Sequence, residues 1–406
     1  MTQKNSIPNP LINVVPERIL LGPGPSNASP RVLQAMMAPM IGYLDPDFVL
    51  IMDEVSDLLK KVFQTEECLT MAISGTGSAG MEAGITSLLE PDDIVVICVA
   101  GFFGERMVEM SKRVGANPIV LRSDWGRPFP PEMLEDELKK HSNVKLVSTV
   151  HAETSTGVLQ PISDISQILK NHDTLFMLDA VTSLGGSEVS LDKWGVDYCY
   201  SATQKCLACP PGLSPAALSP KGYQAIENRK IKPVSWYLDL ALIANYWVLE
   251  HVYHHTAPVS NILGLREALR IVLEEGIGER IARHHRNAVA LRSGLASLGL
   301  SIVVPEEFQL DQVTPIWIPE GVDDTYVRQS LLRDYGIEIG RGLGDFAGKV
   351  WRVGLMGESS KPGYIFSLLS ALEEILPRAG FEVPVGAGVA SASKSLSSNV
   401  DGSDNG

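Results

Sequence analysis

Two side chains that could act together on an aldehyde follow successive apolar runs of the chain. Asp179 closes the run 175–179, and Lys205 comes shortly after the next run, 198–201. A lysine amine whose pKa is lowered by burial or by neighbouring charge can form a Schiff base with an aldehyde. A carboxylate beside a ring nitrogen keeps that nitrogen protonated, because an opposite charge favours the charged form. The pair therefore indicates a flat, aldehyde-bearing ring with a basic nitrogen.

A turn of small residues lies upstream of this pair. Residues 74–80 read SGTGSAG and separate a predicted strand from a predicted helix. The free N–H groups and the dipole of a helix start can hold an anion, and Thr76 and Ser78 add hydroxyl donors. The lysine of a nucleotide-binding P-loop is missing, and a tight turn with an ordinary helix cap is the competing interpretation. Together with Asp179 and Lys205, the turn predicts a site for pyridoxal 5′-phosphate, which carries a phosphate, a ring nitrogen and an aldehyde.

The elements that must position these residues alternate along the chain. Strands are predicted at 69–73, 94–99, 118–121, 144–150, 175–179 and 198–201, and helices at 78–89, 105–114, 131–140 and 165–171. Continuous apolar strands between helices predict an α/β fold with a mostly parallel sheet flanked by helices. Ligands of such sheets bind at the carboxyl ends of the strands, where the residues singled out above are placed.

Four segments are expected along the chain. Residues 1–24 contain several prolines and little periodicity, which is typical of an N-terminal arm. Residues 25–270 would form the large cofactor-binding domain. Residues 271–380, with predicted strands at 301–304, 313–318 and 350–353, would form a smaller C-terminal α/β domain. Residues 381–406, rich in Ser, Gly and Ala, are expected to be a flexible tail.

Composition narrows the class of protein. The 406 residues are 45% hydrophobic and 20% charged with a net charge of −14, which argues against a nucleic-acid or anionic-membrane binder. The five cysteines are scattered, so a reducing intracellular compartment is expected, most simply the cytoplasm, and the last residues match no peroxisomal signal. No metal site is expected, because the Cys206–Cys209 spacing has no second pair and the adjacent His254 and His255 point in different directions.

Several longer motifs resemble one known family. They are LGPGPSN (21–27), SGTG (74–77), HAETSTGVLQP (151–161), DAVTSLGG (179–186), QK (204–205), YHHT (253–256) and KVWRVGL (349–355). On these motifs, the chain resembles the class V aminotransferases of the type I pyridoxal-phosphate fold. It is most similar to their alanine–glyoxylate and serine–pyruvate branch, from about residue 20 to about residue 376.

The resemblance implies a role for each matching position. Lys205 would form the Schiff base and move the substrate proton, Asp179 would pair with the ring nitrogen, and Arg352 would bind the substrate carboxylate. The remaining contacts to the cofactor are expected from Thr76, Gly77, Ser78, Phe103, Thr154 and Gln204.

Other positions are implied to act at the edge of the site or in the partner subunit. Gly24 and Asn27 belong to the segment that approaches the substrate. Tyr253 and Thr256 would reach the cofactor phosphate of a neighbouring subunit, which implies a homodimer with shared active sites.

The chain departs from the family at three positions. Relatives often have Trp where Phe103 stands and His where Ser78 stands, so the indole N–H and a possible positive charge are lost. Both changes bear on cofactor affinity. Arg341 stands where relatives commonly have another glycine; it either adds an anion contact or is an exposed side chain.

The expected function is transfer of an amino group from a small amino acid, alanine or serine, to a small 2-oxo acid, glyoxylate or pyruvate, with ping-pong kinetics. Pyridoxamine–pyruvate and 2-aminoethylphosphonate transaminases share much of the pattern. A cysteine desulfurase fits less well, because no cysteine follows Cys209. A non-catalytic, regulatory cofactor-binding protein is the alternative of a different class.

Overall fold

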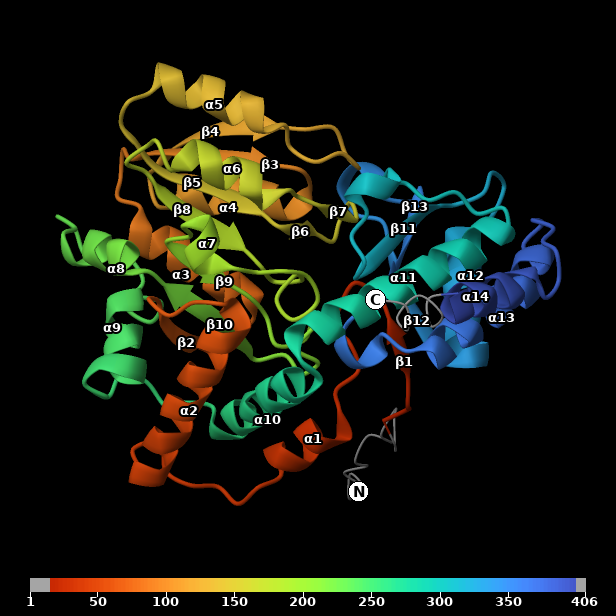
Figure 1. The fold of residues 1–406 in the computed structure, drawn as a ribbon, viewed down its shortest axis with the longest axis horizontal. Coiled ribbons are helices and arrows are strands. Elements are labelled where there is room, and N and C mark those ends of the chain that lie inside the picture. The colour runs from red at the N-terminus through yellow and green to blue at the C-terminus, as the bar shows by residue number, and fades with distance from the viewer. Residues whose placement is uncertain (1–14, 399–406) are drawn as a thin grey trace, which may run out of the picture.

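The computed structural model describes residues 15–398, which form two α/β halves, each built on its own sheet (Figure 1). Among these residues the large domain has a seven-stranded sheet. Its strands, in their order across the sheet, are β2 (Leu69–Ser74), β10 (Leu213–Leu218), β9 (Tyr198–Tyr200), β8 (Leu175–Asp179), β5 (Val144–Val150), β3 (Ile94–Val99) and β4 (Asn117–Arg122). Neighbouring strands are parallel except at β10, which is antiparallel to β2 and β9. The expected mostly parallel sheet is confirmed.

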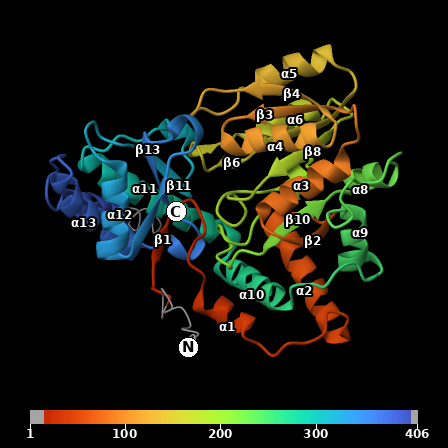
Figure 2. The same cartoon turned by 180° about the vertical axis from the view of Figure 1, so that it is seen from behind.

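Burial explains why these segments form strands. Almost every residue of β3, β5 and β8 is buried, as expected for strands covered on both faces. Helices lie on both sides of the sheet (Figures 1 and 2). They are α2 (Pro46–Phe63), α3 (Gly77–Leu88), α4 (Phe102–Arg113), α5 (Pro131–Lys140), α6 (Ile162–Leu169), α7 (Leu191–Trp194), α8 (Pro220–Glu227) and α9 (Leu240–Ala244). The carboxyl ends of the parallel strands therefore meet at one edge, where polar side chains can gather.

The small domain is built on a mixed sheet. Its strands, in order, are β1 (Ile19–Leu21), β12 (Ile337–Arg341), β13 (Val350–Gly354) and β11 (Val313–Trp317). β1 is parallel to β12, and the other pairs are antiparallel. The helices of this domain are α11 (Ile277–Ser297), α12 (Asp324–Tyr335), α13 (Pro362–Arg378) and α14 (Ala387–Ser398). Its apolar core includes Leu21, which comes from the other end of the chain.

The remaining elements lie within or between the two halves. They are α1 (Pro30–Met36), the hairpin β6 (Ala152–Glu153) and β7 (Val158–Leu159), the π-helical turn η1 (Asn245–Leu249), α10 (Val259–Glu275), and the 3₁₀ turns η2 (Glu306–Phe308), η3 (Gly344–Phe346) and η4 (Gly357–Ser359). α1 packs on α10, and α10 leads into α11 of the small domain (Figure 1). None of the helices within residues 15–398 is long and apolar enough to cross a membrane.

Three expectations about local structure are corrected. Residues 19–21 of the predicted arm form β1, because a parallel partner, β12, is available far along the chain. Residues 387–398 of the predicted flexible tail form α14, which packs closely on α11. A Cβ added to Gly294 of α11 would lie 2.9 Å from the carbonyl oxygen of Gly388, so only small residues permit this contact. The predicted strand 301–304 is reduced to a single bridge between Ile302 and Ile316. The rest of the arm up to residue 14 and the tail from residue 399 lie outside the described residues.

Candidate active site

A cavity opens where strands β5 and β8 end and helix α3 begins. Its walls carry most of the residues expected to hold the cofactor, namely Thr76, Gly77, Ser78, Phe103, Thr154, Asp179, Gln204 and Lys205. The same cavity is lined by Met81, Arg106, Val150, Ala152, Val181 and Thr182. Residues that are up to 129 positions apart in the sequence therefore meet at the edge of one sheet.

Asp179 is the last residue of β8, and its carboxylate is held from two sides. The backbone N–H of Val181 donates to Oδ1 at 2.8 Å, and the Tyr200 hydroxyl donates to Oδ2 at 2.6 Å. Burial raises the pKa of Asp179 to about 6, although the Tyr200 hydroxyl works in the opposite direction. A positively charged group bound beside it would favour the ionised carboxylate.

Lys205 lies in a turn after β9 and is partly buried. Burial, and to a smaller extent the charge of Arg352, lowers the pKa of its amine to about 8. A larger fraction of this amine is therefore neutral and nucleophilic near pH 7 than for an exposed lysine. The amine donates a short hydrogen bond to the carbonyl oxygen of Pro23.

The N-terminal segment covers this lysine. A Cβ on Gly24, whose φ is +109°, would lie 2.5 Å from the lysine Nζ, so only glycine fits there. Ser26 does not line the cavity. Its hydroxyl donates to the carbonyl oxygen of Lys205 at 2.8 Å. Asn27 belongs to the same segment; its side-chain oxygen accepts the N–H of Leu20 and its N–H₂ group donates to the carbonyl oxygen of Arg18, and a role of this segment toward the substrate stays a prediction.

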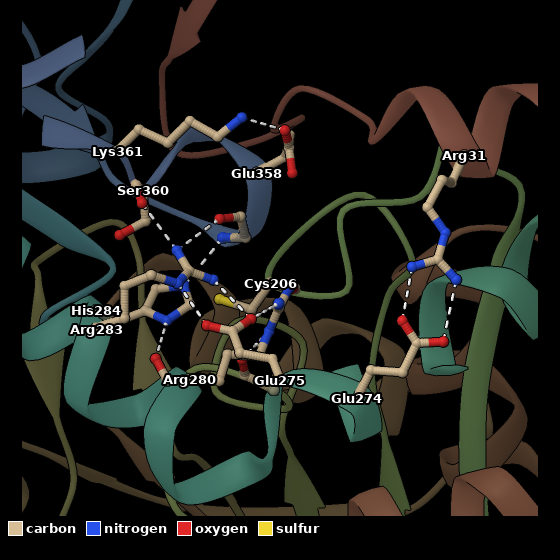
Figure 3. A network of polar contacts seen from close by, with 12 residues as sticks. Arg31, Cys206, Glu274, Glu275, Arg280, Arg283, His284, Glu358, Ser360 and Lys361 are labelled. Atoms are coloured by element: carbon tan, nitrogen blue, oxygen red, sulfur yellow. Dashed lines mark hydrogen bonds and ion pairs between the residues drawn. The ribbon is translucent and has the colours of Figure 1, made fainter. Parts of the chain in front are cut away.

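The backbone around Lys205 is also held from the small domain (Figure 3). Arg280, near the start of α11, donates to the carbonyl oxygens of Cys206 at 2.6 Å and Gly185 at 3.0 Å. One turn later, His284 accepts the N–H of Gly357 on Nε2 at 2.9 Å. Burial lowers the pKa of His284 to about 3, so the ring is neutral and its Nδ1–H donates to the carbonyl oxygen of Arg280. The start of α11 thus fixes the turn that carries the lysine.

Arg352 comes to the site from strand β13 of the small domain. It is 5% exposed, and it donates from Nε to the carbonyl oxygen of Arg341 and from Nη1 to that of Thr154, at 2.8 and 2.9 Å. Within residues 15–398 its Nη2 has no hydrogen-bond partner, which leaves a donor for an anion. Burial lowers the pKa of Arg352 to about 10, still high enough to keep it charged at neutral pH.

Arg341 belongs to the opposite face of the small sheet. It is directly opposite Trp351 in the ladder of β12 and β13, and residues directly opposite each other share a face. Trp351 is adjacent to Arg352, so the two point to opposite faces. The side chain of Arg341 is exposed. Of the two alternatives weighed for this residue, the structure favours the exposed one.

Glu153 is a buried carboxylate that the sequence analysis did not single out. It accepts hydrogen bonds from the backbone N–H groups of Phe103 and Ser155, at 3.1 and 3.0 Å, and from the Ser155 hydroxyl at 2.6 Å. Burial raises the pKa of Glu153. It fixes the start of α4, and with it the Phe103 ring that lines the cavity. The only sequence signal for Glu153 is its place in the motif 151–161. A motif does not show which backbone N–H groups a side chain binds.

The opposite end of the cavity is suited to an anion. Thr76 is the N-cap of α3, yet its side chain makes no capping hydrogen bond. In the described part of the chain the N–H groups of Gly77 and Ser78 have no partner either, so this helix start offers free donors. The side-chain oxygen of Gln204 is buried without a hydrogen-bond partner, and as an acceptor it calls for a donor, whereas the N–H₂ group of the same amide could donate to an anion.

Tyr253 and Thr256 do not reach this cavity within their own chain. Both are exposed, Tyr253 by 50%, and neither belongs to the cavity wall. Their expected contact with a neighbouring subunit's cofactor stays a prediction.

The arrangement fits pyridoxal 5′-phosphate. An amine with a lowered pKa matches the aldehyde, a buried carboxylate matches the ring nitrogen, and the free N–H groups of an uncapped helix start match the phosphate.

Comparison with known proteins gives the same assignment. The class-V aminotransferase family model matches residues 19–346. Three solved structures are similar: ureidoglycine–glyoxylate aminotransferase from Bacillus subtilis (37% identical, TM-score 0.93, covering 95% of this chain and 99% of that one), alanine–glyoxylate aminotransferase from Nostoc sp. (47%, 0.88, 91% and 97%), and pyridoxamine–pyruvate aminotransferase from Mesorhizobium loti (29%, 0.89, 94% and 97%). The chain therefore belongs to the class-V aminotransferases, a family that depends on pyridoxal 5′-phosphate.

Proposed function

We propose that the protein moves an amino group from a small amino acid, alanine or serine, to a small 2-oxo acid, glyoxylate or pyruvate. The observation that carries this proposal is the meeting of Lys205 and Asp179 in one cavity with the buried, charged Arg352 close enough to influence the lysine pKa. The names of two similar structures contain glyoxylate, which supports glyoxylate as the acceptor. The amino group would move in two half-reactions, the first product leaving before the second substrate enters, which is ping-pong kinetics.

The residues of the chain divide the work. When bound, the cofactor supplies an aldehyde for the amino group and an electron sink for the substrate's α-carbon. Asp179 would hold the ring nitrogen protonated, and the free backbone N–H groups of Gly77 and Ser78, with the side-chain N–H₂ group of Gln204, would hold the phosphate. The Lys205 amine, with a pKa of about 8, can accept and return a proton at the substrate's α-carbon near neutral pH.

Arg352 would select the substrate. Its charge and the free Nη2 match an α-carboxylate, and charge-assisted hydrogen bonds of this kind are strong. Because Nε and Nη1 are already bonded to backbone carbonyl groups, the guanidinium is held in one orientation before substrate arrives.

The test is a matrix of amino donors against oxo-acid acceptors, measured with the holoenzyme. We expect the highest kcat/KM for alanine or serine with glyoxylate or pyruvate, and intersecting double-reciprocal lines would contradict the ping-pong scheme. Lys205→Ala should lose turnover and the visible absorbance of the bound cofactor together. If the purified variant keeps both, the assignment of Lys205 is wrong.

Cysteine desulfurase chemistry is not supported. Burial raises the pKa of Cys206 and of Cys209 to about 12, and that of Cys68 to about 11, so these thiols are not poised as nucleophiles. Sulfide release from cysteine measured in the same matrix should stay at background. A regulatory, non-catalytic role would instead appear as cofactor absorbance that no amino acid changes.

We also propose a homodimer with shared active sites. Exposed apolar side chains gather on the α1–α2 connection and on residues 231–253; they include Met37, Met40, Leu44, Val234, Trp236, Leu249 and Val252. The two segments are adjacent, because the rings of Tyr43 and Tyr253 stack at 5.3 Å. An exposed apolar area of this kind is typical of a protein–protein interface.

Mixing two inactive variants tests the sharing of sites. Lys205→Ala would inactivate the site of its own chain, whereas a Tyr253→Ala, Thr256→Ala chain would impair the site of its partner. A mixed dimer should then regain one working site. Mixtures that stay inactive, although sedimentation shows a dimer, would contradict the shared-site arrangement.

A further inference from the structure

A half-buried arginine that the cofactor assignment does not use lines the cavity. Arg106 lies on α4, on the wall that it shares with Thr76, Gly77 and Ser78. Among residues 15–398 no carboxylate pairs with it; Glu105 and Glu109, its neighbours on α4, pair with Arg122 and Arg113 instead. A partly buried guanidinium without a counter-charge, on the wall of a cavity, indicates that the missing negative charge comes from a ligand.

The hydrogen bond of Arg106 has a defined direction. Its Nη1 donates to Ser78 Oγ at 2.9 Å, since a guanidinium has no acceptor. Ser78 Oγ is therefore the acceptor, and its own proton remains available. An O–H group that accepts from a cation becomes a stronger donor. Because Ser78 stands in the first turn of α3, that donor adds to the free N–H groups of the helix start.

The same guanidinium also rests on an aromatic ring. Its central carbon is 4.9 Å from the centroid of the Phe103 ring and 5.5 Å from that of Phe102. Cation–π contacts at this distance are attractive and restrict the ring. Arg106 thus contacts both Ser78 and Phe103, two positions at which the sequence departs from its relatives in ways that bear on cofactor affinity.

No other side chain of the turn can supply a positive charge. Residues 74–80 contain no Lys, Arg or His, and the amine of Lys205 is assigned to the aldehyde. We propose that Arg106 is a positioning residue for the phosphate of the cofactor, acting through the Ser78 hydroxyl and keeping the phosphate doubly charged. This proposal rests on the proposed function, because it needs pyridoxal 5′-phosphate in this cavity.

The test compares two ligands that differ only in the phosphate. Apoprotein would be titrated with pyridoxal 5′-phosphate and with pyridoxal, and bound ligand measured by absorbance after equilibrium dialysis. Arg106→Gln should raise the Kd for pyridoxal 5′-phosphate by about 10- to 150-fold, the range expected for a charge-assisted hydrogen bond. The Kd for pyridoxal should stay unchanged, and Arg106→Lys should recover part of the loss. Arg113→Gln, on the same helix but paired with Glu109 at the surface, is the matched control.

A phosphorus NMR titration of the bound cofactor gives a second readout. The second pKa of a phosphate monoester is ordinarily about 6. With Arg106 in place the phosphate should stay a dianion below this pH, and in Arg106→Gln the titration should move upward. In the double variant Ser78→Ala, Arg106→Gln, the loss should be smaller than the sum of the two single losses, because the arginine acts through the serine.

Each contrary result has its own meaning. If the wild-type apoprotein binds neither ligand, the proposed function fails. If it binds pyridoxal 5′-phosphate and folded Arg106→Gln binds it equally well, only the role of Arg106 fails. Equal losses for both ligands would also overturn that role, because they would indicate a contact with the ring. Should Arg106→Gln not fold, Arg106→Lys and Ser78→Ala decide, since both must weaken pyridoxal 5′-phosphate binding more than pyridoxal binding.

Discussion

The two sheets contribute to the candidate active site in different ways. The large sheet places Asp179 at the end of a buried strand and Lys205 in a turn just beyond another, and the Asp179 carboxylate is held by groups of the same domain. The small sheet lends Arg352, whose Nη1 is held across the domain boundary by Thr154. Asp179 is therefore fixed within one domain, whereas Lys205, whose turn is also held by Arg280, and Arg352 both depend on how the two domains meet.

Replacing Asp179 tests the contribution of the large domain, and we expect it to have the largest effect on catalysis. Asp179→Asn keeps the shape and removes the charge that would hold the ring nitrogen protonated. A neighbouring carboxylate moves a pKa by about 1–3 units, so kcat should fall by up to about 1,000-fold. Asp197→Asn, another buried carboxylate of the same sheet but outside this cavity, is the control and should affect folding stability alone. Equal kcat values for both variants would contradict the role of Asp179.

The reactivity of Lys205 should have its own pH dependence. Burial lowers its pKa to about 8, so the neutral amine should increase about tenfold per pH unit below 8 and level off above it. At pH 7 it should carry about 300 times more neutral amine than a lysine of ordinary pKa. Reductive methylation of the apoprotein at a series of pH values, read by peptide mass spectrometry, measures this. A labelling rate that rises steadily to pH 10, as for exposed lysines of the same digest, would contradict the lowered pKa.

Replacing Arg352 tests the contribution of the small domain to substrate binding. Arg352→Gln removes a charged hydrogen bond to the substrate carboxylate, worth about 1.5–3 kcal/mol, which corresponds to a fall in kcat/KM of about 10- to 150-fold. The loss should appear mainly in KM. Arg341→Gln, an exposed neighbour on the opposite face of the same sheet, should change little. If the two variants behave alike, the carboxylate is bound elsewhere.

A substitution at the boundary between the two domains should have the smallest effect on catalysis. Arg280→Gln would leave the carbonyl groups of Cys206 and Gly185 without their charged donor, at a cost of about 1–3 kcal/mol in unfolding free energy. We expect a modest fall in kcat, because the turn that carries Lys205 loses one of its supports. Arg286→Gln, on the same helix α11, is the control. A lower melting temperature with unchanged kcat would show that the turn holds its place without Arg280.

The sequence predicted the large sheet and the catalytic pair well because the signals are local. Strands of continuous apolar residues between helices have few alternative arrangements, and polar residues directly after them must lie at one edge. The predicted segments 144–150 and 175–179 agree with β5 and β8 residue for residue.

The missed features depend on contacts that local patterns do not encode. β1 has three residues and is defined by a partner more than 300 positions away. The small residues of α14 suggested flexibility, but they are what allows the helix to approach Gly294. Arg106 and Arg280 carry no signal in sequence, because the importance of each comes from the backbone or hydroxyl group that it meets in the folded chain.

The segment over Lys205 ties both halves of the molecule to the same amine. Immediately before it, β1 is a strand of the small sheet, and immediately after it, α1 packs on α10 beside the large domain. Any hinge movement that carries β1 away from the large domain would therefore drag the Pro23 carbonyl off the lysine. Without bound cofactor, separation of the two halves and release of the Lys205 amine from the Pro23 carbonyl group would therefore occur together.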